Sequence, residues 1–309
     1  MAQQSIWLVS EPGRTPASAV ARRTLRTRLD AVWSELRAAA GDRPAPERVH
    51  RLRVAIRRTL AALRAFAGLL PAKRRGWFEK RLRRLRRAAG EARDLDVLAE
   101  RLRQEPGDPQ PAPSRQARDR LITMLSRQRA ASRAPIRRLH DALVAADWHG
   151  RTERLLEAVG SRGRDRPFAA FARRRFRPLV ERFCALADRR LRSAEQLHRL
   201  RIEGKKLRYA LEIFGCVLPT GSRARCEEAL ERLQETLGEF TDHAAAADRL
   251  RRWARSAGWG SQQRTLAALR AREVARATAA RKAFAAWWNP ARRRRLRRAL
   301  ERSVRGRAA

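Results

Sequence analysis

Two stretches of this chain, residues 50–102 and 198–250, align without a gap when 148 is added to each position of the first. Identical residues hold this register from end to end: His50 and His198, Arg53 and Arg201, Leu63 and Leu211, Phe66 and Phe214, Pro71 and Pro219, Gly90 and Gly238, Glu91 and Glu239, Asp94 and Asp242, Leu102 and Leu250. At an offset of 151, a second group matches: Pro16, Arg22, Arg23 and Arg26 with Pro167, Arg173, Arg174 and Arg177. Similarity at a fixed spacing indicates one structural unit that occurs twice.

The pattern of apolar residues predicts that both units are helical. Apolar residues recur at helical spacing almost throughout, and no segment shows the sustained alternation of a strand. We therefore predict an all-α fold with two tandem four-helix bundles related by an internal pseudo-twofold repeat. The expected boundaries are a tail over residues 1–13, a first bundle over 14–160 and a second over 161–309. At 309 residues, each half has room for a core of its own.

Helix ends are predicted from local signals. Ser193, followed by Gln196, is typical of a capping box that starts a helix, and Thr15 before Pro16 is a candidate start for the first helix. Proline, glycine and serine mark the other expected breaks, which fall at Pro44 and Pro46, Pro71, residues 106–113, residues 160–167, residues 219–222 and residues 258–261.

The charge of the chain points to a polyanionic partner. It contains 73 Lys and Arg against 32 Asp and Glu, a formal charge of +41, and self-repulsion on this scale is relieved by binding a polyanion. Nearly all the positive charge is arginine, whose guanidinium group binds phosphate oxygens in bidentate fashion. A GC-rich genome is the alternative explanation for arginine in place of lysine, but it does not explain the excess of base over acid.

Several classes of function find no support in the sequence. Cys184, Cys216 and Cys226 lack the spacing of a zinc site, so we interpret them as reduced core thiols and expect neither metal nor cofactor. No nucleotide-binding loop, hydrolase motif or pair of catalytic carboxylates is present, so we do not expect an enzyme. No apolar run is long enough for a membrane span or a signal peptide, which favours a cytoplasmic protein.

The duplicated helices are amphipathic, with a basic side. In the first, Leu52, Ile56, Leu60, Leu63 and Leu70 fall on one side and form the expected core stripe. The other side is a basic arc, which consists of His50, Arg51, Arg53, Arg57, Arg58 and Arg64 in the first copy and of His198, Arg199, Arg201, Lys205 and Lys206 in the second.

Three observations favour anion binding over the alternative of an ordinary solvated helix face. First, the arc between residues 50 and 70 has almost no carboxylates, whereas solvated helices gain from opposite charges at i,i+4 spacing. Second, a histidine occupies the same place in each arc, and the surrounding cations favour its neutral form until an anion arrives. Third, the arcs include small or aromatic residues, which indicates that they border a groove: Ala61, Ala65, Gly68, Ile202 and Tyr209.

Other charged residues receive weaker predictions. Further basic rows that could line the groove are Arg22 with Arg26, Arg173 with Arg177, and Arg129 with Arg133 and Arg137, although solvated faces remain the alternative for each. The recurring acids Asp94, Asp242, Glu91 and Glu239 are expected to hold arginine side chains in place. The histidines without a counterpart, His140, His149 and His243, are expected at surface or core positions.

The repeated strings resemble the two halves of a CHAD domain, the conserved histidine α-helical domain. They are VHRLRVAIRRTLAALRAF (49–66) with GEARDLDVL (90–98), and LHRLRIEGKKLRYALEIF (197–214) with GEFTDHAAA (238–246). The resemblance covers about residues 14–305. It implies two four-helix bundles about a pseudo-twofold axis, a basic groove or pore across them, and binding of inorganic polyphosphate.

The resemblance also implies particular binding residues, which match the family motif at His50, Arg53, Arg57, Arg58, His198, Arg201, Lys205, Lys206 and Arg208. The copies differ, because Leu60 and Ala61 stand where the second copy has Arg208 and Tyr209, and Asp242 lies in a less typical GEFTD string. Unequal contributions from the halves are therefore expected. Many relatives carry a CYTH triphosphate-tunnel domain. No ExExK string for one occurs here, so a stand-alone binder without hydrolytic activity is expected.

Binding of RNA or DNA is the alternative function, because charge alone does not distinguish one phosphate chain from another. Single-strand binders place aromatic side chains among the basic residues to stack on bases. Tyr209 is the only aromatic residue near the arcs, since Phe66 and Phe214 are expected to point into the core, so only weak nucleic-acid binding at low salt is expected. A scaffold that recruits proteins to polyphosphate granules is compatible with the main prediction.

Overall fold

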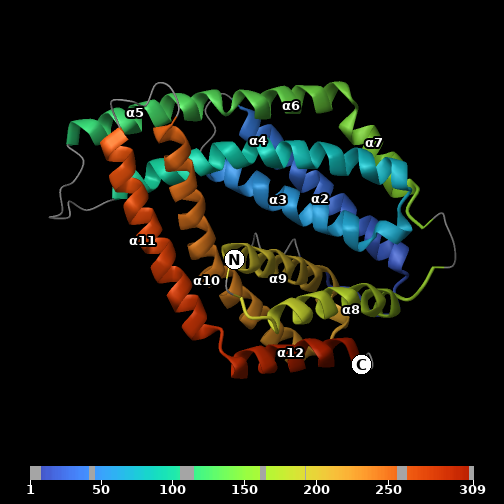
Figure 1. The fold of residues 1–309 in the computed structure, drawn as a ribbon. Helices are drawn as coiled ribbons and strands as arrows, with labels where there is room; N and C mark the ends of the chain where they lie inside the picture. The colour runs from blue at the N-terminus through green and yellow to red at the C-terminus, as the bar shows by residue number, and fades with distance from the viewer. Residues whose placement is uncertain are drawn as a thin grey trace.

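The computed structural model describes residues 8–41, 46–104, 115–160, 165–191, 193–255 and 263–305. Within these residues the chain is helical and no strand is present, which confirms the all-α prediction. The first half contains α2 (Ala17–Ala40), α3 (Pro46–Ala65), the 3-10 turn η1 (Ala67–Leu69), α4 (Ala72–Gln104), α5 (Arg115–Ala131), α6 (Ala134–Ala145) and α7 (Trp148–Glu157). The second half contains α8 (Phe168–Ala187), α9 (Ala194–Phe214), η2 (Gly215–Val217), α10 (Thr220–Ala254), α11 (Gln263–Trp287) and α12 (Pro290–Arg305) (Figure 1).

The starts of the elements recur at the offsets of the sequence repeat. Helix α3, turn η1 and helix α4 begin 148 residues before α9, η2 and α10, and α2 begins 151 residues before α8. The equivalent residues Pro16 and Pro167 form an antiparallel bridge. Its two hydrogen bonds are reciprocal, since the Ala17 N–H donates to the Arg166 carbonyl (2.9 Å) and the Phe168 N–H to the Thr15 carbonyl (2.8 Å). Such reciprocity is what a local two-fold axis between the halves produces.

Of the two predicted helix starts, one is correct in detail. Ser193 accepts a hydrogen bond from the Gln196 N–H, and the Gln196 side chain accepts one from the Ser193 N–H, which confirms the capping box of α9. The prediction for Thr15 is wrong, because Pro16 is the N-cap of α2 and no side chain caps this helix. The Thr15 carbonyl instead belongs to the bridge between the halves.

The halves share one hydrophobic core, whereas the sequence suggested a separate core in each. The main cluster of buried side chains runs through α2–α4, α6 and α7 and continues through α8–α12. The Phe66 ring stacks on Phe171 at 5.8 Å and meets the edge of Phe214 at 6.3 Å, so aromatic residues of both halves interlock. A smaller cluster joins the ends of α4 and α10 to α5 and α11. The two halves therefore form one packing unit.

The described part of the predicted tail is attached to the second half. The Val9 N–H donates to the Glu212 carbonyl (2.9 Å), the Ala169 N–H donates to the Gly13 carbonyl (2.9 Å), and Val9 packs against the main core. Residues 1–7 and the predicted breaks at Pro44, 106–113 and 258–261 lie outside the described residues. None of the helices in the described part of the chain has the length and apolar character needed to cross a membrane.

Candidate functional site

The two motif helices, α3 and α9, contact each other and turn their apolar stripes into the shared core. The predicted stripe of α3 is confirmed, since Leu52, Ile56, Leu60 and Leu63 are all buried. In α9 the residues equivalent to Leu52 and Leu63 are Leu200 and Leu211, and both are buried, as is Leu207. Because one side of each helix is used for the core, the basic arcs are left on the opposite sides.

A first cavity of about 910 Å³ lies between α3, α4, α8 and α9. Nine of its lining residues are Lys or Arg and none is Asp or Glu: Arg57, Arg64, Arg86, Arg174, Arg175, Arg182, Arg201, Lys205 and Lys206. The remaining lining residues include His198 and the apolar residues Leu60, Ala61, Ala65, Pro178, Leu179, Ile202, Tyr209, Ala210 and Phe214. Four of the five small or aromatic residues predicted to border a groove therefore do so, while Gly68 does not line this cavity.

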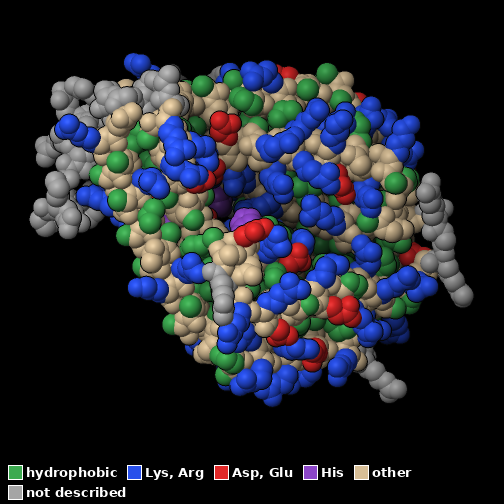
Figure 2. All heavy atoms as spheres, in the orientation of Figure 1, with side chains coloured by type: hydrophobic (Ala, Val, Ile, Leu, Met, Phe, Trp, Pro, Cys, Tyr) green, Lys and Arg blue, Asp and Glu red, His purple; other side chains and the backbone are tan. Residues whose placement is uncertain are grey.

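A second cavity of about 320 Å³ adjoins the first, between α3, α4, α9 and α10. His50, Arg53, Arg93, Arg249 and Arg252 line it, together with Asp94 and Asp242. Arg57, Arg201 and Lys205 line both cavities and so mark the place where the two meet. We call the two cavities together the basic groove. Figure 2 shows a hollow near the middle of the molecule, surrounded by Lys and Arg side chains, with histidine visible in it.

Arg53 and its counterpart Arg201 have equivalent neighbours in the two halves. The Arg53 and Arg201 guanidinium groups lie 3.9 Å from Asp94 and 3.6 Å from Asp242, which confirms that these aspartates hold arginine side chains. A Cβ on Gly90 would lie 3.2 Å from Arg53 Nη1, and one on Gly238 would lie 3.4 Å from Arg201 Nη2. Each guanidinium group thus lies close to the helix backbone, at a position where glycine has no side chain to occupy the space. Burial is the main cause that lowers the pKa of Arg53 and Arg201.

Lys205 lies where the cavities meet, and its environment disfavours the cation. Burial, followed by repulsion from Arg201 and Arg57, lowers the pKa of Lys205 from 10.5 to about 7. The amine of its neighbour Lys206 is held differently, in an ion pair with Glu203 one turn earlier on α9.

The environment of His50 agrees with the sequence prediction. Burial, followed by repulsion from Arg93 and Arg57, lowers the pKa of its imidazole, so the neutral form is favoured while the groove holds no anion. The equivalent histidine of the second copy, His198, is exposed and lines the first cavity. The two motif histidines therefore lie in different cavities.

Two residues of the predicted set, Arg58 and Arg208, do not line the groove. Arg58 makes a bidentate ion pair with Glu212 of α9 (2.9 and 3.0 Å), and both side chains are nearly buried, with 13% and 10% exposed. The buried Arg28 donates to the Arg58 carbonyl, and burial lowers its pKa to about 10. Arg58 therefore joins α3 to α9. Arg208 lies over the Tyr209 ring at 5.1 Å and lines neither cavity.

The predicted rows outside the motif helices do not line the groove. Arg22 donates to the Leu156 and Val159 carbonyls at the end of α7, and Arg26 pairs with Glu153 of α7. In the α5–α6 row, Arg129 pairs with Asp96, Arg133 is the N-cap of α6 and Arg137 donates to the Ala40 carbonyl. Arg173 and Arg177 lie on α8 outside both cavities. Most of these arginines attach one helix to another.

The groove contains arginines that spacing within the motif helices does not identify. On α8 the neighbouring residues Arg174, Arg175 and Arg182 face the first cavity in place of Arg173 and Arg177. Arg174 and Arg182 are eight residues apart, a spacing that keeps them on one side of a helix. Arg175 also donates to the Arg64 and Ala65 carbonyls at the end of α3, which fixes α8 beside that helix.

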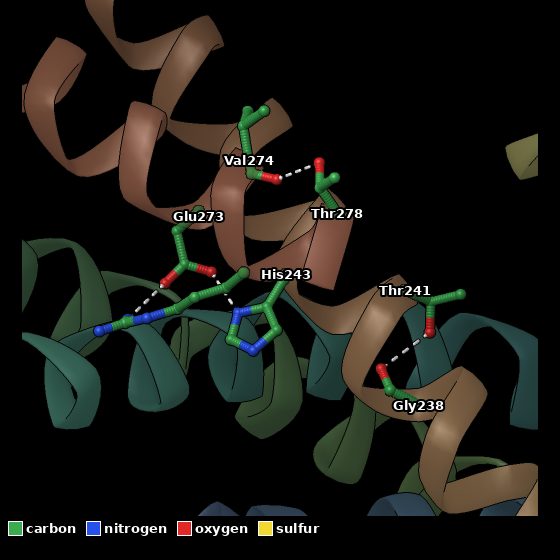
Figure 3. Close-up of polar contacts among 7 residues, drawn as sticks. Gly238, Thr241, His243, Glu273, Val274 and Thr278 are labelled. Carbon is green, nitrogen blue, oxygen red and sulfur yellow. Dashed lines mark hydrogen bonds and ion pairs between the residues drawn. The ribbon is translucent and has the colours of Figure 1, made fainter. Parts of the chain in front are cut away.

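The histidine–carboxylate contact outside the groove has a structural role. His243 Nδ1 of α10 lies 2.7 Å from Glu273 Oε2 of α11 (Figure 3). Glu273 also accepts a hydrogen bond from Arg276. Because Glu273 is buried, the contact supplies the partners that a buried carboxylate requires. The three cysteines are free thiols, and burial raises the pKa of Cys184 and Cys226 to about 11. Among the described residues, no group of three metal-ligating side chains comes together.

Comparison with known proteins places the chain in a family. The CHAD domain family matches residues 23–251, so the chain belongs to the CHAD family, which is associated with polyphosphate. The fold is similar to the CHAD domain from the plant Ricinus communis, with a TM-score of 0.70 at 21% identity over 97% of this chain and 96% of that one. PptA from Streptomyces chartreusis gives a TM-score of 0.52 at 20% identity over 89% of this chain and 99% of that one. No curated protein matches the sequence.

Proposed function

We propose that this protein binds inorganic polyphosphate in the basic groove. The observation that carries the proposal is the junction of two cavities at Arg57, Arg201 and Lys205, with nine basic residues and no carboxylate around the larger cavity. Such a surface matches a ligand that carries negative charge along its whole length. Binding displaces cations condensed on the polymer, so affinity falls as salt is raised.

Most basic side chains of the first cavity are available for an anion. Seven of the nine make no ion pair with any described residue, and Arg175 is the one of these that donates to backbone carbonyls. The other six are Arg57, Arg64, Arg86, Arg174, Arg182 and Lys205. The second cavity adds His50 and Arg53, and the first adds His198. Helix α3 has 20 residues and so spans roughly 30 Å, which allows several successive phosphates to be bound along it.

The character of the lining favours polyphosphate over a nucleic acid. Binding of bases requires exposed aromatic faces between the cations. Tyr209 is only 8% exposed and has Arg208 over its ring, and Phe214 is fully buried. The groove therefore offers phosphate contacts without a platform on which bases can stack.

Binding to long-chain polyphosphate at about 150 mM salt tests the proposal, with single-stranded RNA of equal charge as competitor. The variant with His50, Arg53, His198 and Arg201 changed to Ala should lose affinity by well over tenfold, because charge-assisted hydrogen bonds each contribute about 1.5–3 kcal/mol. Arg57→Ala should lose roughly tenfold alone. Arg177→Ala is the matched control, because it removes the same charge from an exposed position outside the groove. Equal losses in all three variants, or stronger binding to RNA, would refute the proposal.

The proposed activity is binding without catalysis, in the cytoplasm at polyphosphate granules. A chain whose groove is filled by the polymer leaves its outer helices free, and these would recruit granule-associated proteins. A fluorescent fusion should gather at granules, whereas the fusion with the four alanine substitutions should be diffuse. Granule localisation that survives these substitutions would refute targeting through the groove.

A further inference from the structure

The amine of Lys205 has different surroundings from the amine of its neighbour Lys206. Lys205 lies in the middle of α9, lines both cavities and makes no ion pair with a described residue. Lys206 lines the first cavity as well, but its amine is engaged by Glu203. The chain therefore has two adjacent lysines in one cavity, one held by a carboxylate and one surrounded by guanidinium groups.

The surroundings of Lys205 make its amine a nucleophile at neutral pH. The charged groups that act on it are Arg57 of α3, Arg201 of α9 and Asp242 of α10, which line the groove, and more weakly Arg208 of α9, which lies outside the two cavities. Burial, the largest cause, and the three arginines all disfavour the cation, and together they outweigh the aspartate, which favours it, so the pKa falls to about 7. About half of the amine is then unprotonated near pH 7, whereas an ordinary lysine with a pKa near 10.4 is almost fully protonated.

The part of the groove around Lys205 combines phosphate-binding groups with apolar surface. Arg57 and Arg201 lie on the walls beside Lys205, and guanidinium groups bind phosphate oxygens in bidentate fashion. Leu60, Ala61 and Ile202 line the same cavity. A small molecule with a phosphate at one end and a short apolar group at the other fits this combination.

We propose that Lys205 is an acylation site whose acyl donor is an acyl phosphate. The Lys205 Nζ lone pair attacks the carbonyl carbon of the donor and forms a C–N bond. The C–O bond to phosphate then breaks, and the phosphate leaves with the electron pair while solvent takes the amine proton. The product is an uncharged amide at the junction of the two cavities, and no oxidant or reductant is needed.

Acetyl phosphate is the probe that tests this proposal on the full chain. The chain has five lysines, at positions 73, 80, 205, 206 and 282, so peptide mass spectrometry can follow acetylation at each. At pH 7, Lys205 should acetylate at least about tenfold faster than Lys206, because its amine makes no ion pair with a described residue, whereas the Lys206 amine is held by Glu203. Inorganic phosphate should slow this reaction by competition. Equal rates at all five lysines, or a faster reaction at Lys206, would overturn the proposal.

Two controls distinguish binding of the acyl phosphate in the cavity from the intrinsic reactivity of the Lys205 amine. Acetic anhydride carries no phosphate, so with this reagent the preference for Lys205 should shrink and free phosphate should have no effect. An identical preference with both reagents would overturn the role of an acyl phosphate. Lys206→Arg should keep the fast site and Lys205→Arg should remove it, with circular dichroism to confirm that both variants fold.

The labelling contains no polyphosphate, so its outcome does not depend on the proposed function. Polyphosphate binding is then compared between the acetylated and the untreated protein. If polyphosphate binds in the basic groove, acetylation of Lys205 should weaken polyphosphate binding by about 10- to 100-fold, since one charge-assisted contact is lost. If the chain does not bind polyphosphate at all, selective acetylation still supports the modification site.

Discussion

The affinity for polyphosphate should depend steeply on pH because of Lys205. Only the protonated amine attracts a phosphate, and in the free protein burial and the neighbouring arginines lower its pKa to about 7. A bound polyanion stabilises the cation and returns this pKa toward 10.5, so binding takes up a proton when the pH is above about 7. The contribution of Lys205 is therefore nearly complete below about pH 6 and decreases as the pH rises through about 7.

The size of the pH effect on affinity follows from the pKa of Lys205 in the free and in the bound protein. At about pH 6 nearly all of the free protein carries a protonated Lys205, whereas at about pH 9 only roughly 1% does. If the bound state stays protonated throughout, affinity falls by about 100-fold between these values, equivalent to about 2.7 kcal/mol. His50 acts in the same direction at lower pH, since its pKa lies below the ordinary value.

Titration calorimetry at constant ionic strength between pH 6 and 9 measures this dependence. Buffers with different ionisation enthalpies report the proton uptake, which should approach one proton per site near pH 8. Lys205→Arg keeps a permanent positive charge, so its affinity should be almost independent of pH above 7. The reasoning is refuted if the Arg variant shows the same pH dependence as the unaltered protein.

Three further predictions concern the framework of the groove. Glu212→Gln should lower the free energy of unfolding by about 3 kcal/mol, because it removes the carboxylate that forms the nearly buried ion pair with Arg58. Gly204→Ala should cost about 1–3 kcal/mol, since the added Cβ would lie 2.9 Å from Leu233 Cδ2 in the packed interior. Ser193→Ala should cost about 1 kcal/mol by removing the N-cap of α9. Urea denaturation followed by circular dichroism measures all three.

Each of these substitutions has a control. The double substitution Arg58→Met with Glu212→Leu should recover most of the loss, because it removes both buried charges. Gly68→Ala should be nearly neutral, since no atom lies within 4 Å of an added Cβ. Ser193→Asp should retain the stability of the cap. A stable Glu212→Gln variant, or equal losses at Gly204 and Gly68, would contradict the packing described above.

The motif helices were predictable because their pattern is local. Apolar residues three and four positions apart lie on one side of a helix, so Leu52, Ile56 and Leu60 could be assigned to the core without knowing what covers them. That Asp94 and Asp242 hold arginine side chains was predicted from their recurrence in both copies, whereas the structure identified Arg53 and Arg201 as the partners. The cap at Ser193 involves residues only three positions apart, and it too was predicted correctly.

Long-range packing decided which cations face the groove. Arg58 lies in the same basic arc as Arg57, but Glu212, 154 residues away, takes its guanidinium group into the junction of the halves. On α8 the groove is lined by Arg174 and Arg182, not by the row at Arg173 and Arg177. Arg173 and Arg174 are adjacent in sequence, so a small rotation of α8 about its axis decides which of them faces the groove. That rotation is set by the helices that pack against α8.

The sequence by itself determined the all-helical fold, the repeat, the core stripes, the basic arcs and the excess of positive charge, because each follows from spacing or composition along the chain. Only the tertiary structure decided that the halves share one core, that Arg22 and Arg26 bind α7, and that Arg57, Arg201 and Lys205 meet between two cavities. The physical reason is that the spacing of apolar residues along the sequence shows only which side of a helix is buried. The partner of each charge is set by helices that lie far away in the sequence.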